Sequence, residues 1–220
     1  MPALRTLVIG DAPEAWEQLG FTVGRDHVWL GRVAIQLAGT DTGRGILGWT
    51  IEGVEDDIDG LRSVHEPEIG QQNFLAHDNG MFGIDRLEIV TDDLDRTSAA
   101  FESAGLRERT REVEPHENGS RSRAVFWAGR TVIEVVESTT GTGEAAFGGL
   151  SVVCDDFDRT VEILGSALTP RRAANQADRY RASIVADATN VSIPIDVISP
   201  PPNAGIELLA ADTRSGPANQ

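Results

Sequence analysis

The sequence repeats a segment of fourteen residues, and this internal repeat constrains the fold more than any other feature. Residues 84–97 align without gaps on residues 147–160, which lie 63 positions later. Both copies contain an alternating apolar stretch that ends in the motif Asp-Asp-x-Asp-Arg-Thr. Two weaker copies occupy residues 49–60 and 6–11. Because repeated segments indicate repeated supersecondary units, the chain is expected to consist of similar modules.

The acidic cluster of each copy predicts a turn from a strand into a helix. An Asp at a helix start accepts hydrogen bonds from unpaired amides, and neighbouring acids are stabilised by the helix dipole. Helices are therefore expected over residues 98–105 and 161–168, with Gly105 and Pro170 marking their ends. Strands are expected over residues 107–114, 121–127 and 131–137 after one helix, and over residues 171–175, 179–186 and 191–198 after the other. Each unit then reads βαβββ, which gives an α+β fold class.

The four parts of the chain differ in how clearly they follow this pattern. Residues 1–66 are expected to contain a degenerate βαβββ-like unit, with strands near 4–10, 21–23, 27–31 and 33–38 and a helix near 16–19, followed by a truncated repeat that begins at Trp49. A helix-like stretch is expected after each copy of the repeat. Residues 67–81 are interpreted as a linker, because Pro67 and Gly70 precede a polar run. Residues 82–200 are expected to form a complete pair of modules, and residues 201–220 a flexible tail.

These patterns resemble the vicinal oxygen chelate superfamily, which includes glyoxalases, bleomycin-resistance proteins and extradiol dioxygenases. The resemblance lies in residues 83–97, in residues 132–136 and in residues 148–199. We call residues 82–138 module one and residues 147–200 module two. The resemblance implies that the sheets of the two modules curl around a cleft that binds a small molecule. It also implies a possible homodimer, because modules of this family often pair across chains.

The resemblance further implies a metal site, of which this sequence keeps only a part. The family places a residue, usually His, early in the first strand and a carboxylate on the last strand. The first-strand positions hold Arg86, Gly149 and Thr50, none of which coordinates a divalent cation as imidazole does. The last-strand positions hold Glu134 and Asp196. We therefore expect a cleft without a cofactor, in which Arg86 forms an ion pair with Glu134 in place of a metal.

Side-chain alternation supplies further candidates for the cleft. Arg86 and Glu88 share one face of their strand, because side chains alternate between the two faces. The ion pair of Arg86 with Glu134 is either structural only, or its guanidinium also clamps a ligand carboxylate or polarised oxygen, or the site binds a metal weakly. Beside an arginine, Glu88 is expected to have a lowered pKa, which suits a base better than an acid. The catalytic candidates are Arg86, Glu134 and Glu88, and the candidate ligand-binding residues are Arg86, Glu88, Glu134, Arg123, Trp127 and Asp196.

Two other classes of function compete with a metal-independent ligand-binding protein or enzyme. One is a metal-dependent lyase, isomerase or dioxygenase, in which a divalent metal is held by Glu134, Asp196 and a histidine, His77 or His116. The other is a non-catalytic interaction protein without a ligand. Residues 55–66 also match the ligand spacing of a calcium loop, but they align with the two helix-capping turns, and we interpret them as such a turn.

Charge and composition narrow the classes of partner. The formal net charge is −16 and no basic patch interrupts it, which argues against binding to nucleic acid or to an anionic membrane. No apolar run is long enough to span a bilayer and no signal peptide is readable, so a cytoplasmic location is expected. The single cysteine, Cys154, agrees with a reducing compartment.

Overall fold

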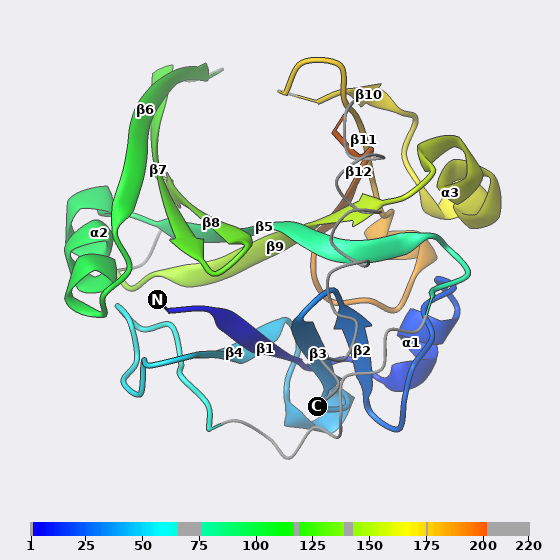
Figure 1. Cartoon of the computed structure of the whole chain (residues 1–220), viewed down its shortest axis with the longest axis horizontal. Helices are drawn as coiled ribbons and strands as arrows, with labels where there is room; N and C mark the ends of the chain where they lie inside the picture. Colours follow the sequence, from blue (N-terminus) through cyan, green and yellow to red (C-terminus); the bar gives the residue numbers. More distant parts are fainter. Residues whose placement is uncertain (1, 66–75, 117–118, 139–142, 175, 202–220) are drawn as a thin grey trace, which may run out of the picture.

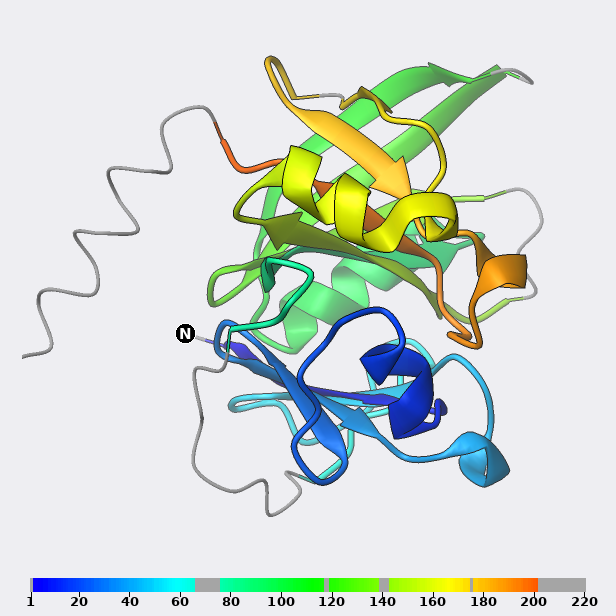
Figure 2. The same cartoon turned by 90° about the vertical axis from the view of Figure 1, so that its right-hand side faces the viewer.

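The computed structural model describes residues 2–65, 76–116, 119–138, 143–174 and 176–201, and it contains two β-sheets. The larger sheet has eight strands and curls into a U, with helix α2 outside one arm and helix α3 outside the other (Figure 1). The smaller sheet has four strands and lies beneath the floor of the U. Figure 2 shows the two sheets as separate layers.

Both modules have the predicted βαβββ order, and together they form the eight-stranded sheet. The first strand of each module runs parallel to its last strand, and the two first strands, β5 and β9, pair antiparallel at the centre. The strand order is β10-β11-β12-β9-β5-β8-β7-β6. Module one contains β5 (Met81–Thr91), α2 (Leu94–Ser103), β6 (Glu108–His116), β7 (Gly119–Ala128) and β8 (Thr131–Glu137). Module two contains β9 (Ala146–Cys154), α3 (Phe157–Leu164), the short helix η2 (Gly165–Ala167), β10 (Arg172–Ala173), β11 (Tyr180–Ser183), the short helix η3 (Ala186–Ala188) and β12 (Ile195–Ile198).

The acidic clusters cap the two long helices, but the helices begin four residues earlier than predicted. The side chain of Asp93 accepts a hydrogen bond from the backbone N–H of Arg96, and Asp156 accepts one from the N–H of Arg159. The helices therefore start directly after these residues, and the last acid of each cluster already lies in the first turn. A carboxylate in the first turn is favourable because it faces the positive end of the helix dipole.

The N-terminal residues form the four-stranded sheet, in the order β2-β3-β1-β4. Residues 21–23, predicted as a strand, are not one, although Phe21 is buried. Strand β4 pairs antiparallel with β1, as β9 does with β5, and Ser63 bridges in parallel to Trp49. The elements are β1 (Leu4–Ile9), α1 (Pro13–Glu17), β2 (His27–Leu30), β3 (Val33–Leu37), the short helix η1 (Thr40–Thr42) and β4 (Ile46–Ile51).

The segment after β4 corrects one expectation, because residues 52–65 fold into turns and bridges rather than into a helix. Gly53 and Gly60 have positive φ angles of 80° and 86°, a conformation that interrupts a right-handed helix. Asp59 is also in the left-handed region, with φ 47°. The truncated repeat therefore contributes a single regular strand, β4, followed by turns that bridge back to it.

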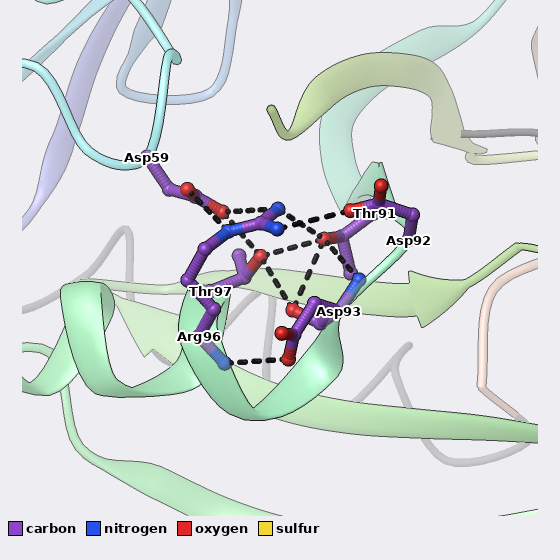
Figure 3. Close-up of polar contacts among 6 residues, drawn as sticks. All are labelled: Asp59, Thr91, Asp92, Asp93, Arg96 and Thr97. Atoms are coloured by element: carbon purple, nitrogen blue, oxygen red, sulfur yellow. Dashed lines mark hydrogen bonds and ion pairs between the residues drawn. The ribbon is translucent and has the colours of Figure 1, made fainter. Parts of the chain in front are cut away.

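The acidic turn at Asp59 joins this segment to module one. Its carboxylate accepts hydrogen bonds from Arg96 Nε at 2.8 Å and Nη2 at 3.2 Å, and also from the hydroxyl of Thr97 (Figure 3). The Asp59 side chain is only 9% exposed, so its carboxylate is largely shielded from water. Among the described residues, no group of three His, Cys, Asp or Glu side chains is arranged to hold a metal ion. The acids of this turn thus serve as an anchor on helix α2.

One hydrophobic core lies between the two sheets and buries the outer face of the central strands of the larger sheet. Leu87 and Ile89 of β5 are fully buried there. The ring of Trp49 lies edge-on to Phe101 and Phe147, at centroid distances of 6.0 and 5.1 Å. Because side chains alternate along a strand, Glu88, which lies between Leu87 and Ile89, faces the inner side of the U.

Residues 67–75 of the predicted linker and residues 202–220 of the predicted tail lie outside the described residues. The end of the linker is packed against the N-terminal sheet. Asn79 is buried, donates to the carbonyl oxygen of Leu19 at 2.8 Å and accepts from the N–H of Met81 at 2.9 Å. In the part of the chain that the structure describes, no helix is long and apolar enough to cross a membrane.

Candidate functional site

A cavity of about 330 Å³ opens on the inner face of the curled sheet, and both modules line it. Its size suits a small organic molecule. Its polar groups include four guanidinium groups and three carboxylates, in a chain whose net charge is −16. The lining residues are Arg86, Glu88, Arg121, Arg123, Glu134, Val136, Gly149, Leu150, Ser151, Arg181, Pro194 and Asp196.

The ion pair expected between Arg86 and Glu134 is present, and a second arginine joins it. Arg86 Nη1 lies 2.5 Å from Glu134 Oε2, and Arg123 Nη1 lies 2.8 Å from Glu134 Oε1. Strands β5 and β8 place the first pair in contact, because they run parallel with Arg86 opposite Val132, two positions before Glu134. Glu134 is 5% exposed. Both of its oxygens are therefore occupied by guanidinium groups, with little access for water.

Module two repeats this arrangement in a looser form. Asp196 lies opposite Ser151 as Glu134 lies opposite Glu88, and Ser151 is 63 positions after Glu88. Arg181 Nη1 lies 3.8 Å from Asp196 Oδ2, and the hydroxyl of Ser183 donates to Asp196 Oδ1. Each module thus presents a last-strand carboxylate beside an arginine of its third strand.

Glu88 is the carboxylate of the cavity that no arginine holds closely. In the described part of the chain, no hydrogen bond or ion pair reaches its carboxylate within normal distance. Burial raises the pKa of Glu88, and the nearby guanidinium of Arg121 opposes this effect without reversing it. The negative charges of Glu134 and Asp196 raise this pKa further. The sequence-based expectation of a lowered pKa is therefore corrected, because desolvation outweighs the attraction of Arg86.

The position equivalent to Arg86 in module two is Gly149, and the backbone leaves no space there for a side chain. A Cβ atom at Gly149 would lie 2.6 Å from the carbonyl oxygen of Pro194, closer than real Cβ atoms approach. The irregular segment that ends at Pro194 fills this part of the cleft, and the predicted strand over residues 191–198 begins only at Ile195. An imidazole at this position would require the segment to move.

Two of the candidate residues lie outside the cavity lining. Trp127 lies on the same face of β7 as Arg123, because residues 123, 125 and 127 alternate onto one face. However, Trp127 is 48% exposed and does not line the cavity. His77 is buried in the N-terminal layer, where Nδ1 accepts from the N–H of Thr22 at 3.0 Å and Nε2 donates to the carbonyl oxygen of Trp29 at 2.8 Å. Burial lowers the pKa of His77. The side chain of His116 lies outside the described residues.

Sequence reasoning missed three polar residues of the lining, namely Arg121, Ser151 and Arg181, and the apolar residues Val136, Leu150 and Pro194. Arg121 could have been found from alternation, since it lies two residues before Arg123. Arg181 could have been found by comparing the pairing of strands in the two modules. Arg123 pairs with Val136, and Arg181 pairs with Ile198, which is the equivalent last-strand position of module two. Ser151 is the residue that the internal repeat places on Glu88.

Solved structures with the same fold come from enzymes of the superfamily that the sequence resembles. A mutant 4-hydroxymandelate synthase from Streptomyces coelicolor is similar over 90% of this chain and 93% of its own, with 13% identity and a TM-score of 0.56. A catechol 2,3-dioxygenase is similar over 99% of this chain and 94% of its own, with 11% identity and a TM-score of 0.53. The chain has the vicinal oxygen chelate fold.

A third structure with this fold is a xylose isomerase-like TIM barrel/4-hydroxyphenylpyruvate dioxygenase fusion protein. The similarity covers 97% of this chain and 53% of the fusion protein, with 12% identity and a TM-score of 0.59. No family model matches the sequence, and no curated protein matches it. At these identities the vicinal oxygen chelate fold is what the structures share.

The side chains at the usual metal positions of the vicinal oxygen chelate fold do not fit a metal ion. The two first-strand positions offer a guanidinium at Arg86 and no side chain at Gly149. Of the two last-strand carboxylates, Glu134 is saturated by arginines, and Asp196 accepts from Ser183 with Arg181 nearby. Arg86 places a positive charge where the imidazole ligand usually lies, and both last-strand carboxylates already have partners, so these four positions do not form a set of metal ligands.

Proposed function

We propose that the cleft binds a small organic anion without the help of a metal ion. The observation that carries this proposal is the position of Arg86, which stands where the fold usually places a metal ligand and pairs with Glu134 across the cavity. A guanidinium presents a planar set of N–H donors that matches a carboxylate or a phosphate. In this proposal a fixed cation of the protein takes the role that a bound cation has in other proteins of this fold.

The charge distribution supports an anionic ligand over a neutral or cationic one. The chain as a whole is strongly acidic, so an anion is repelled at a distance and is attracted only where guanidinium groups are concentrated. Four such groups line one cavity of about 330 Å³. Because the cavity walls exclude part of the solvent, charge-assisted hydrogen bonds are stronger there than at the open surface.

A thermal-shift screen of the purified chain against organic acids, phosphate esters and neutral analogues of the same size tests this proposal. The expected result is stabilisation by a subset of the acids, its loss in Arg86→Gln, and no change in Arg5→Gln, which removes an exposed arginine of the N-terminal sheet. Stabilisation by neutral compounds alone would overturn the proposal. Absence of any stabilising compound would favour an interaction protein instead.

Metal analysis of the same sample separates this proposal from a metal-dependent enzyme. The expected result is a substoichiometric metal content and an unchanged melting temperature after treatment with a chelator. A tightly held stoichiometric metal, with a melting temperature that falls after chelation and recovers after metal is added back, would overturn the metal-independent proposal.

Proton transfer to or from the bound anion is a second candidate function, and Glu88 favours it. Its carboxylate lines the cavity with a raised pKa and lacks a close partner among the described residues. A carboxylate with a raised pKa is a stronger base than an ordinary one, and its acid form can return the proton. Exchange of a carbon-bound hydrogen of a bound acid in deuterated water, followed by NMR, should occur with the wild-type chain and be lost in Glu88→Gln, while binding persists.

A further inference from the structure

We propose that the ligand of this cleft carries two anionic groups on one small carbon skeleton, one held by Arg86 of module one and the other by Arg181 of module two. The inference rests on the proposed function, and it adds the number and placement of the charges on the ligand. The chemical class that fits is a short linear dicarboxylate.

The first observation is that both arginines have unused donors inside the cavity lining. The Nε atoms of Arg86 and Arg181 are buried and have no hydrogen-bond partner in the part of the chain that the structure describes. A buried donor without a partner destabilises the folded chain, and more so when the group is charged. Each of these arginines therefore has hydrogen-bonding capacity that the protein does not use, and an anion that draws the side chain further into the cavity would use it.

The second observation is that these two donors belong to opposite halves of the cleft. Arg86 lies on β5 and Arg181 on β11, and strands β9 and β12 lie between them. At about 4.8 Å per strand, the two backbones are separated by roughly 14 Å along the sheet. The sheet curls between these strands (Figure 1), and both side chains line the same cavity, but a single small anionic group cannot occupy both places.

The third observation is that each module surrounds its own carboxylate with two guanidinium groups. Glu134 lies between Arg86 and Arg123, and Arg123 also pairs with the exposed Glu112 at the rim. Asp196 lies 3.8 Å from Arg181 and 3.9 Å from Arg172. A guanidinium has five N–H donors, so one carboxylate cannot occupy the donors of two arginines. Each module therefore keeps donors for one more anionic group.

Three apolar residues of the cavity lining favour a carbon chain over an inorganic anion. Val136, Leu150 and Pro194 line the cavity together with the charged groups. Apolar walls cannot replace the water around a polyphosphate, whereas methylene groups gain free energy when they leave water. Charged ends joined by an apolar middle match this alternation.

The test is isothermal titration calorimetry with linear dicarboxylates from malonate to pimelate, each compared with its own monoamide. The monoamide keeps the length and shape of the acid but loses one charge. We expect at least one diacid to bind ten-fold or more tightly than its monoamide, with an optimum at one chain length. Equal affinity of diacid and monoamide at every length would overturn the two-anchor inference and leave the binding of a single anion intact.

Lysine variants identify the anchors without removing their charge. Arg86→Lys and Arg181→Lys keep a cation but lose the Nε donor and the fork geometry, so each should reduce the preference for the diacid to two-fold or less. Arg5→Lys, outside the cavity, should leave the preference unchanged. A preference that survives in both cleft variants would overturn the assignment of these anchors. Failure of every mono- and dicarboxylate to bind the wild-type chain would count against the proposed function itself.

Discussion

The two carboxylate oxygens of Glu134 accept hydrogen bonds from two different arginines, Oε2 from Arg86 and Oε1 from Arg123. The three residues come from β5, β7 and β8, so the interaction ties three neighbouring strands together across the inner face of the sheet. It also places a guanidinium group on each oxygen that a metal ion would need. The same contact therefore joins the strands of module one and, under the proposed function, sets the charge that the cleft offers to a ligand.

Replacing Glu134 by Gln should destabilise the fold, because the amide cannot neutralise two guanidinium groups that are mostly shielded from water. Their side chains are 23% and 19% exposed, so the loss of free energy of unfolding should be about 1–3 kcal/mol, below the value for a fully buried pair. Urea denaturation of the variant and the wild type measures this loss of free energy of unfolding. Glu112→Gln is the matched control, because Glu112 binds the same Arg123 from an exposed position and its loss should cost less than about 1 kcal/mol. Equal stability of Glu134→Gln and the wild type would contradict this account.

Gly149→Ala should destabilise the protein by about 1–3 kcal/mol, because the added methyl group overlaps the carbonyl of Pro194. Gly83→Ala is the control in the neighbouring central strand, since a Cβ atom there meets nothing within 4 Å. That substitution should be neutral or slightly stabilising, because it restricts the unfolded chain. Thermal denaturation of the two variants in parallel decides the point. A Gly149→Ala variant as stable as Gly83→Ala would show that the Pro194 segment yields easily.

The module architecture was readable from the sequence because its signals are local and repeated. The Asp-Asp-x-Asp-Arg-Thr motif reports a strand, a cap and a helix within one stretch, and alternation correctly placed Arg86 and Glu88 on the inner face. The course of residues 52–65 was not readable, because its turns depend on Asp59 reaching Arg96, 37 positions away in the chain. The raised pKa of Glu88 was missed for a similar reason, since burial depends on how both modules close around it.

The raised pKa of Glu88 predicts a specific dependence of stability on pH. Burial makes the folded pKa higher than the unfolded one, so the folded state binds more protons between the two values. The contribution of Glu88 to stability is therefore fully present below the unfolded pKa and is lost as pH rises through the folded pKa. Glu88→Gln, which mimics the protonated form, should be more stable than the wild type at pH 7 and similar to it at pH 4.

Denaturant unfolding at several pH values between 4 and 8 measures this difference. Glu162→Gln on α3 serves as a control, because Glu162 is exposed and should give the same small difference at every pH. A stability difference between Glu88→Gln and the wild type that does not vary with pH would argue that Glu88 is well solvated in the folded state.

His77 should make the protein less stable in mild acid. Burial lowers its pKa in the folded state, and its ring accepts a hydrogen bond at Nδ1 from Thr22, which requires the neutral form. The unfolded chain binds a proton more readily, so stability is retained above the unfolded pKa of about 6.5 and falls as pH decreases below it. His77→Gln should lose about 1–2 kcal/mol at pH 8 through a lost hydrogen bond, and the gap to the wild type should narrow at pH 5. The exposed His65, replaced by Gln, should show no such trend.

Asp59→Asn tests whether the turn after β4 is anchored on α2 by charge. Asn also tolerates the positive φ of this position, so the substitution removes the negative charge while the backbone conformation is kept. Losing the charge-assisted hydrogen bonds to Arg96 should reduce the free energy of unfolding by about 1–3 kcal/mol. Asp92→Asn is the control, because Asp92 makes a single, more exposed contact with the same arginine and should matter less.

Hydrogen exchange gives a second readout of the Asp59→Asn variant. The amides of Leu61, bonded within the turn, and of Val64, bonded to β4, should exchange faster in this variant, while those of β11 and β12 keep the wild-type rate. Unchanged exchange at both amides would mean that the turn holds its shape through Gly53 and Gly60 alone, with the contact to Arg96 following from the fold and not supporting it.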